Sequence, residues 1–441
     1  MNTRIAALLW SLLCACAAAQ ETAGDSRWRL HADADLIGQS HGGFPSLYQA
    51  PPASGGNSFV ASYERSYSTV LGAQLGYRVS SDTEFWYREE AIKGIALSAA
   101  GGLAGLTNND MERQMTNRFK FYRALAFARG KWDLGGEAVT IDEDETQFHQ
   151  AARSRRLTLT AGNVDVLGLF DGNAWAHKGA DRFLNWCLMT YCAFDYAADS
   201  RGYTWGASGE LAWDAWRLRL GRFAMPRLPN QLALDFRLRQ HHGDIAEAER
   251  DWDGGALRVL AFRNVMRLST YVGPGPIAPL DENYAGPNAR IDRSKTGLGV
   301  DLEQRVAPSL GLFARAMNAH GTGETMAFTE ADRSLSGGLV AEGEAWGRSG
   351  DGAGLGLSAQ FASADRVHYL AQGFFSIFIG DGPPPGGRFR YGAERVVETW
   401  YLFGLGHACG LTIDWQHLAN PAYNRDRGPI DVFGLRLHAE I

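Results

Sequence analysis

The sequence has few long hydrophobic runs, few cysteines and no excess of basic charge, and each absence narrows what the chain can be. Beyond Ala19 no stretch approaches the ~20 consecutive apolar residues that a membrane-spanning helix needs. A mature chain that enters a membrane would therefore have to close a β-barrel, in which every backbone group is paired. The formal net charge is −6 without a basic block that could neutralise phosphates, which argues against a nucleic-acid partner.

The first residues have the order of a secretory signal peptide. Arg4 is followed by an apolar run and then by a string of small residues that ends at Ala19. We expect cleavage there, so that residues 1–19 are a signal peptide and residues 20–441 form one exported domain. A second interpretation is a lipidation box at residues 13–16, although a cysteine stands where that box has a small residue.

Cysteine is scarce in the exported domain, where Cys187, Cys192 and Cys409 remain. Cys187 and Cys192 lie close together in an aromatic segment, and in an oxidising compartment they can form a disulfide that pins a loop. Two unpaired, partly buried thiols are the alternative. No histidine or third cysteine is nearby, so the spacing predicts no metal site, and we expect no cofactor.

Alternation of apolar and polar residues with a period of two is the main structural signal. It is clearest at the two ends, in residues 28–36 (WRLHADADL) and residues 433–441 (FGLRLHAEI). A barrel has to pair its first and last strands, and the chain ends on an apolar residue within such a segment. The pattern predicts strands with one apolar and one charged face, and a soluble β-sandwich is the alternative that alternation alone allows.

The number of such segments predicts the size of the barrel. Counting runs of the ~9 to 11 residues that a tilted membrane strand needs gives eighteen candidates. They start near residues 28, 70, 83, 119, 131, 157, 204, 215, 254, 264, 296, 310, 337, 353, 366, 395, 409 and 430. An even number of strands, 16 or 18, would close an antiparallel barrel wide enough for an aqueous channel.

Some connections are too long for hairpins. Residues 164–203 separate two strong strand patterns without a period-two run, so we expect a functional loop that folds into the lumen and narrows it. Three further long loops are expected on the extracellular side, at residues 273–287, 319–336 and 380–387.

No catalytic constellation is specific enough to predict an enzyme. Residues 202–206 read GYTWG, without the serine of a GxSxG nucleophile motif. His241 and His242 are adjacent, which would place them on opposite faces of a strand, and we expect them to be loop residues rather than metal ligands. An outer-membrane barrel hydrolase, with serine and histidine on adjacent strands, is the enzyme alternative.

A sugar channel needs aromatic faces and planar charged groups that contact a solute weakly and repeatedly. Side chains of this kind gather in one strand pair and in the long loop. The candidates for the pore lining are Trp86, Arg88, Glu90, Arg123, Arg129, Asp171, Asn173 and Trp175. A solvated loop or a distant part of the lumen wall is the alternative for each charge, and a membrane girdle is the alternative for each aromatic.

Several long motifs occur in the order of a known family. They include FDGNAWAHKGADRFLNW at residues 170–186, AFDYAADSRGYTWGA at residues 193–207 and DWQHLANPAYNRDRGPIDVFGLRLHAEI at residues 414–441. Through these motifs the chain resembles the carbohydrate-selective porins of the OprB family over nearly its whole mature length. The resemblance implies a 16-stranded barrel in the outer membrane of a Gram-negative bacterium, with a loop-constricted lumen that passes glucose and related mono- or oligosaccharides by passive diffusion.

By the same resemblance, four polar residues match motif positions of the family: Glu90, Arg123, Asp171 and Asn173. The chain departs from the family at its last residue, Ile441, where an aromatic is usual. The resemblance implies carbohydrate solutes, outer-membrane lipid and lipopolysaccharide as partners, and it leaves a homo-oligomer open. A channel for other small solutes such as organic acids and a soluble periplasmic binding protein are the remaining alternatives.

Overall fold

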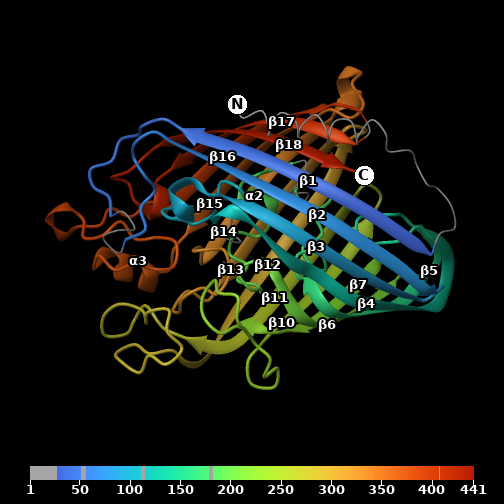
Figure 1. Ribbon diagram of the computed structural model, residues 1–441, viewed down its shortest axis with the longest axis horizontal. Coiled ribbons are helices and arrows are strands. Elements are labelled where there is room, and N and C mark those ends of the chain that lie inside the picture. Colours follow the sequence, from blue (N-terminus) through green and yellow to red (C-terminus); the bar gives the residue numbers. More distant parts are fainter. Residues whose placement is uncertain (1–26, 51–55, 111–114, 178–181, 407) are drawn as a thin grey trace.

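The computed structural model describes residues 27–50, 56–110, 115–177, 182–406 and 408–441, and it shows a closed antiparallel β-barrel (Figure 1). Sixteen strands form the wall, and β1 closes it by pairing with β18. The strands are β1 (Trp28–His41), β2 (Glu64–Ser80), β3 (Thr83–Ile95), β4 (Thr116–Ile141), β5 (Gln150–Asp165), β6 (Tyr203–Trp213), β7 (Trp216–Phe223), β10 (His242–Trp252), β11 (Gly255–Leu268), β12 (Ile291–Ala307), β13 (Leu310–Ala319), β14 (Arg333–Glu342), β15 (Gly352–Phe361), β16 (Glu394–Gly404), β17 (Cys409–Ala419) and β18 (Ile430–Glu440).

The barrel of 16 strands is the one that the family resemblance implies, and the count of eighteen candidates is wrong. The candidates near residues 119 and 131 are one strand, β4, and those near 254 and 264 are both part of β11. The candidate near residue 366 is a helix, α3 (Ala364–Ala371). Strand β10 escaped the count, because its outward face carries small residues and its inward face glutamates, which hides the alternation.

The remaining elements lie in the connections. Strands β8 (Met225–Pro226) and β9 (Leu234–Asp235) form a separate two-stranded sheet between β7 and β10. Helix α2 (Trp186–Met189) lies between β5 and β6, and α3 lies between β15 and β16. None of the helices in the described part of the chain is long and apolar enough to cross a membrane.

Alternation sorts the side chains into an outer apolar face and an inner polar face. On β18 the outward Phe433 and Leu435 are 57% and 52% exposed, whereas the inward Arg436 is fully buried. Exposed tryptophans lie near one end of the barrel, on β1, β4, β6, β7 and β10: Trp28, Trp132, Trp213, Trp216 and Trp252. An apolar band with an aromatic girdle is the surface that a lipid bilayer contacts.

The two ends of the barrel differ in their connections. At the end that carries these tryptophans, short turns join β2 to β3, β6 to β7 and β10 to β11, and Ile441 pairs there with Ala32; we call it the turn end. At the opposite end, the loop end, the long connections gather (Figure 1). The loops expected at residues 273–287, 319–336 and 380–387 all lie at the loop end, between β11 and β12, β13 and β14, and β15 and β16.

Three of these connections are tied together by one buried arginine. Arg366 on α3 is fully buried, donates two 2.8 Å hydrogen bonds to Asp332, and also bonds Glu330. Its guanidinium lies 4.6 Å from the ring centre of Tyr271 in the connection between β11 and β12. Because all partners are inaccessible to water, this arginine holds the loop end in one arrangement.

Substitution of Arg366 by methionine is expected to loosen the loop end by about 3–5 kcal/mol, since two buried carboxylates lose their cation. The barrel wall itself does not depend on this contact. Limited proteolysis of refolded protein should cut the loops of the variant faster while the barrel keeps its compact gel mobility. The exposed Arg388 offers a matched control, Arg388→Met, and equal cleavage of both variants would contradict the assignment.

Candidate pore constriction

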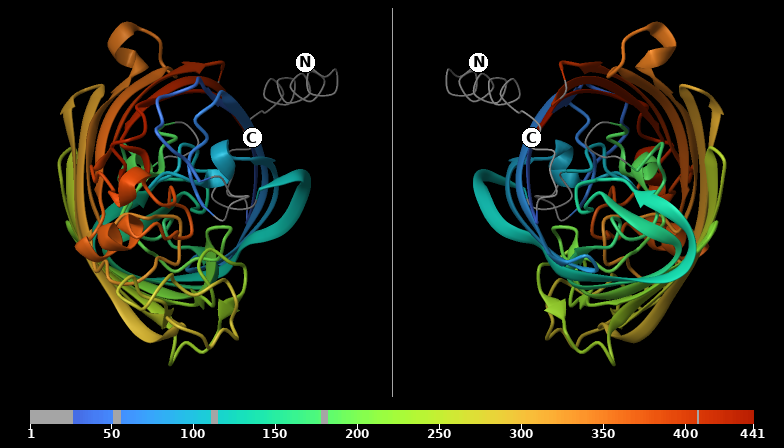
Figure 2. Two further views of the ribbon diagram at one scale, coloured as in Figure 1. Left: turned by 90° about the vertical axis from the view of Figure 1, so that its left-hand side faces the viewer. Right: turned by 90° about the vertical axis from the view of Figure 1, so that its right-hand side faces the viewer.

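The connection between β5 and β6 folds into the barrel instead of standing on its rim (Figure 2). We call the described residues of this connection, 166–177 and 182–202, the inner loop. Its Asp171 forms an ion pair of 3.1 Å with Arg315 on β13, and the backbone nitrogens of Leu184 and Asn185 donate to Glu398 on β16. These partners are inward-facing side chains, so the inner loop packs against the wall formed by β12 to β16.

The described part of the connection between β3 and β4 meets the inner loop inside the lumen. Trp186 donates its backbone nitrogen to the carbonyl of Leu106 at 2.9 Å, and Asn109 donates to the carbonyl of Leu184 at 3.0 Å. Gln39 on β1 donates to the carbonyl of Thr107. The two loops therefore form one body that crosses the interior between opposite walls and narrows it.

Asp171, Asn173 and Trp175 anchor the inner loop to the wall. Asn173 donates to both oxygens of Asp301 at 3.0 and 2.9 Å, and Asp171 accepts from the Thr190 hydroxyl at 2.6 Å. Burial raises the pKa of Asp171 to about 7, although the neighbouring Arg315 favours its ionised form. Each of these three residues therefore fixes the inner loop to the wall, and none of them is more than 4% exposed.

Trp175 reaches the wall at a position without a side chain. A Cβ atom on Gly311 would lie 1.9 Å from the indole, so only glycine leaves room for the ring on β13. Arg305 and Arg182 lie 5.0 and 5.5 Å from the ring centre. This contact holds the first part of the inner loop close to β13.

A second group of predicted residues lies on the opposite wall. Arg88 on β3 donates to both oxygens of Asp33 on β1 at 2.7 and 2.9 Å and to Glu90 at 2.9 Å. Glu90 in turn accepts the hydroxyls of Tyr122 on β4 and Tyr203 on β6, each at 2.7 Å. We call these five inward-facing residues the Arg88 cluster.

A glycine on the intervening strand makes the Arg88 cluster possible. Strand β2 lies between β1 and β3, and its Gly72 pairs with Asp33 on one side and Glu90 on the other. A Cβ atom on Gly72 would lie 2.3 Å from the Arg88 guanidinium and 2.5 Å from the Asp33 carboxylate. Without a side chain there, the guanidinium passes over β2 and reaches the carboxylate two strands away.

Trp86 and Arg129 lie further toward the turn end on the same inner wall. Arg129 donates to Glu84 at 3.0 Å, and Glu84 also pairs with Lys131 at 3.2 Å. The Trp86 ring packs on Phe148 with ring centres 4.9 Å apart. The structure thus brings Trp86, Arg88, Glu90 and Arg129, four of the candidates of this strand pair, to one inner face.

Arg123 does not belong to this inner face. Tyr122, its neighbour on β4, points into the lumen, and alternation therefore turns Arg123 outward. Arg123 pairs in register with Glu89, is exposed, and lies 5.1 Å from the ring centre of Trp205. Its predicted position in the pore lining differs from the structure because register shifts interrupt the pairing of β3 with β4 at this level.

Three residues of the Arg88 cluster are not among the pore-lining residues predicted from the sequence: Asp33, Tyr122 and Tyr203. Asp33 stands on the charged face of the first predicted strand, so its inward direction was readable. Its contact with Arg88 depends on the order and register of β1, β2 and β3, which the sequence does not show. Tyr203 stands in the motif at residues 193–207 and Tyr122 in none of the quoted motifs, and only the structure shows that both bond Glu90.

The inner wall of β6 to β12 carries mainly paired charges. Arg219 contacts Glu210, Glu247 and Glu249, and Arg258 contacts Glu249 and Asp301. Such a wall presents many hydrogen-bonding groups with little uncompensated charge. It resembles the polar lumen of a water-filled channel rather than an apolar core.

Cys187 and Cys192 are joined by a disulfide within the inner loop, beside Gly105 of the neighbouring loop. The side chain of Asn185 accepts the backbone N–H of Cys187 at 3.0 Å, which caps α2. The bridge closes a short turn in a segment already fixed by hydrogen bonds. Among the described residues, no group of His, Cys, Asp and Glu has an arrangement that would hold a metal ion.

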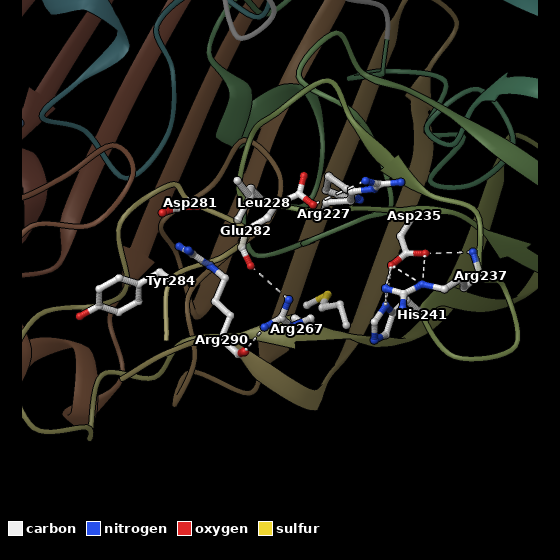
Figure 3. Close-up of a pocket in the computed structure, with 12 residues that line it drawn as sticks. Arg227, Leu228, Asp235, Arg237, His241, Arg267, Asp281, Glu282, Tyr284 and Arg290 are labelled. Carbon is white, nitrogen blue, oxygen red and sulfur yellow. Dashed lines mark hydrogen bonds and ion pairs between the residues drawn. The ribbon is translucent and has the colours of Figure 1, made fainter. Parts of the chain in front are cut away.

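His241 and His242 lie at the loop end, away from the constriction. His241 is 2.6 Å from Asp235 and helps to line a cavity of about 270 Å³ between the connections of β7 to β10 and β11 to β12 (Figure 3). The prediction that both are loop residues is wrong for His242, which is the first residue of β10. The charged groups of this cavity pair mainly with one another, as Arg237 does with Asp235.

A closed barrel with an apolar outer face, a charged interior and a loop folded into its lumen defines a diffusion channel of the outer membrane, a porin. A family model described as carbohydrate-selective porin, OprB family, matches residues 74–440. The chain belongs to this family. No curated protein matches the sequence.

Solved structures show the same fold. The chain is similar to the high-pH structure of Pseudomonas putida OprB, with 15% identity, 94% of each chain covered and a TM-score of 0.67. It is also similar to the outer membrane channel DcaP of Acinetobacter baumannii, with 8% identity, coverage of 96% of this chain and 99% of that one, and a TM-score of 0.50. Family and fold are those of a channel, and the expected OprB resemblance is confirmed.

Proposed function

We propose that the Arg88 cluster is where a neutral sugar contacts the wall of this carbohydrate-selective porin. The observation that carries the proposal is a guanidinium held flat between two carboxylates, with two tyrosine hydroxyls on one of them. Each group can exchange a hydrogen bond with a sugar hydroxyl. Because the groups are already paired, a sugar replaces one partial contact by another, which gives the weak binding that transit requires.

The charge of the cluster favours neutral solutes over anions. Asp33 and Glu90 together outweigh the single cation Arg88, so an organic acid would meet a net negative site. This supports sugars over the organic-acid alternative. Ser98 and His41 both contact Glu64, at 2.9 and 3.5 Å, but the carboxylate lies between them, whereas a hydrolase needs the histidine next to the serine as its base.

Sugar titration of single channels in a planar bilayer tests the proposal. Glucose at millimolar concentration is expected to interrupt the current, maltose less readily, and a charged organic acid least. Tyr203→Phe removes one hydroxyl from Glu90 and should weaken the glucose block by about 0.5–1.5 kcal/mol, roughly a twofold to thirteenfold rise in half-blocking concentration. Block by the acid alone would move the function to anionic solutes, and protein that forms no channel would contradict a porin.

We also propose that the chain is exported and that its barrel contacts the lipid of the outer membrane. The signal peptide at residues 1–19 lies outside the described residues, and export through it stays a prediction. The tryptophans of the turn end and the apolar outer strands support contact with outer-membrane lipid, with the long loops directed to the cell exterior and lipopolysaccharide. The homo-oligomer stays a prediction.

A further inference from the structure

Strands β4 and β5 extend past the barrel wall at the turn end and form a long hairpin that curves over the opening (Figure 2). The pairing of Asp133 with Arg156 marks the point where the hairpin leaves the regular wall. Its connecting segment, residues 142–149, is named here the hairpin tip. Short turns serve most other strand pairs at this end, so the extra length needs an explanation of its own.

Two glycines turn the hairpin back toward the barrel. Gly135 and Gly136 have φ angles of +104° and +86°, and the register of β4 with β5 shifts on both sides of Gly135. Bulges of this kind bend a strand pair sharply. The base of the hairpin is held by Asp214, which accepts from Ser154 at 2.8 Å and pairs with Arg155 at 2.9 Å.

The hairpin tip enters the barrel mouth and binds the inner wall there. Arg29 on β1 donates to the carbonyl of Gln147 at 2.7 Å, and Arg129 on β4 donates to the carbonyl of Thr146 at 2.6 Å. Arg78 and Gln74 on β2 donate in the same way to the carbonyls of His149 and Glu145. All four donors are inward-facing side chains, on β1, β2 and β4.

An aromatic contact completes the docking. Phe148 of the tip lies on the inward-facing Trp86, with ring centres 4.9 Å apart, and the Arg78 guanidinium lies 4.5 Å from the centre of the Phe148 ring. Both rings are nearly inaccessible, at 5% and 2% exposure. Tip and wall are therefore packed together as in a protein core, and the tip occupies space that would otherwise belong to the lumen.

The docked tip lies directly beyond the Arg88 cluster on the path toward the turn end. Trp86 precedes Arg88 by one inward position on β3, and Gln74, which binds the tip, pairs in register with Arg88. The Glu145 side chain is exposed although the segment is docked. A solute that leaves the cluster toward the periplasm thus meets the hairpin tip next.

We propose that the hairpin tip forms a second constriction at the periplasmic exit and sets the upper size of the sugar that the channel releases. The Arg88 cluster selects by hydrogen bonding and charge, whereas the tip limits width through backbone and aromatic groups. The proposal concerns a separate segment from the sugar contact site, although it rests on the same channel function. A tip that only braced the wall would leave size selection unchanged.

Two variants remove the tip from the exit in different ways. In the first, residues 135–154 are replaced by an Asn-Gly turn that joins Leu134 to Arg155, a turn suited to a two-residue hairpin. In the second, Gly136→Val places a branched residue at φ +86°, where a Cβ atom would also lie 2.3 Å from the Ser154 hydroxyl. Gly347→Val is the matched control, because Gly347 also has a positive φ in a turn-end connection but lies away from the hairpin.

Liposome swelling with glucose, maltose and maltotriose, together with single-channel conductance, measures the effect. Both hairpin variants are expected to conduct severalfold more than the intact chain and to admit the larger sugars, while glucose still blocks the current at the Arg88 cluster. Gly347→Val should behave as the intact chain. Unchanged conductance and size dependence in a folded Gly136→Val protein would overturn the proposal, whereas absence of glucose block in the intact chain would overturn the sugar contact site instead.

Discussion

Replacement of Arg315 by methionine is expected to release the inner loop from the barrel wall and to raise the single-channel conductance severalfold. Arg315 is 3% exposed and pairs with Asp171 at 3.1 Å and with Asp301 at 2.7 Å. It also donates to the carbonyls of Leu188 and Met189, each at 3.0 Å. One side chain therefore fixes the start and the middle of the loop to β12 and β13.

The size of the effect follows from burial. Methionine fills much of the volume of arginine but leaves the buried Asp171 without its cation, whereas Asp301 keeps Arg258 at 3.1 Å; the loss is about 3–5 kcal/mol. The disulfide and the contact with Glu398 still hold the far part of the loop. The loop should therefore fluctuate between docked and undocked positions, which a bilayer recording shows as larger and noisier current steps.

The control for this experiment is another arginine of the inner wall. Arg217 pairs with Glu249 and Asp251 and is not among the contacts of the inner loop. Arg217→Met should change the conductance only slightly. A second variant, Asp171→Asn combined with Arg315→Met, removes part of the unpaired charge and should return the current steps toward those of the intact chain. Quiet, unchanged channels in Arg315→Met would show that the loop is held by its other contacts alone.

The sequence predicts the barrel well because its signal is local. Residues 28–36 and 433–441 carry their alternation in the chain itself, and the structure pairs them as first and last strands. The count of strands from the sequence was wrong where the alternation of apolar and polar residues is not visible in the chain itself. Strand β10 faces inward with Glu247 and Glu249, and these glutamates pair with arginines of β7 and β11 that lie elsewhere in the chain.

The candidate site was predictable in composition but not in arrangement. The inner loop was evident from the missing alternation over residues 164–203, and Asp171 and Asn173 were evident as its polar residues. Their partners Arg315 and Asp301 stand far away in the chain, so no local pattern distinguishes an anchor from a pore-lining residue. The contact of Trp86 with Phe148 of the hairpin tip likewise joins residues far apart in the chain, so no local pattern predicts it.

Replacement of Arg88 by methionine is expected to make the channel strongly cation-selective and to abolish the glucose block. Arg88 is the cation between Asp33 and Glu90, with guanidinium nitrogens 2.7 and 2.9 Å from their carboxylates. Two unit charges at 4 Å interact by about 4 kcal/mol at the effective dielectric of a partly solvated site. Loss of the cation therefore deepens the negative potential of the narrow lumen, and anions are excluded.

The reversal potential in a salt gradient measures the selectivity, and glucose titration of the current measures the block. Arg88→Lys separates the two effects, because lysine keeps the charge but lacks the planar fork that bonds two carboxylate oxygens at once. The lysine variant should keep the selectivity of the intact channel and still lose much of its glucose block. A full glucose block in Arg88→Lys would show that a point charge suffices and that the flat guanidinium over Gly72 has no part in sugar recognition. A full glucose block in Arg88→Met would show that the sugar binds elsewhere in the lumen.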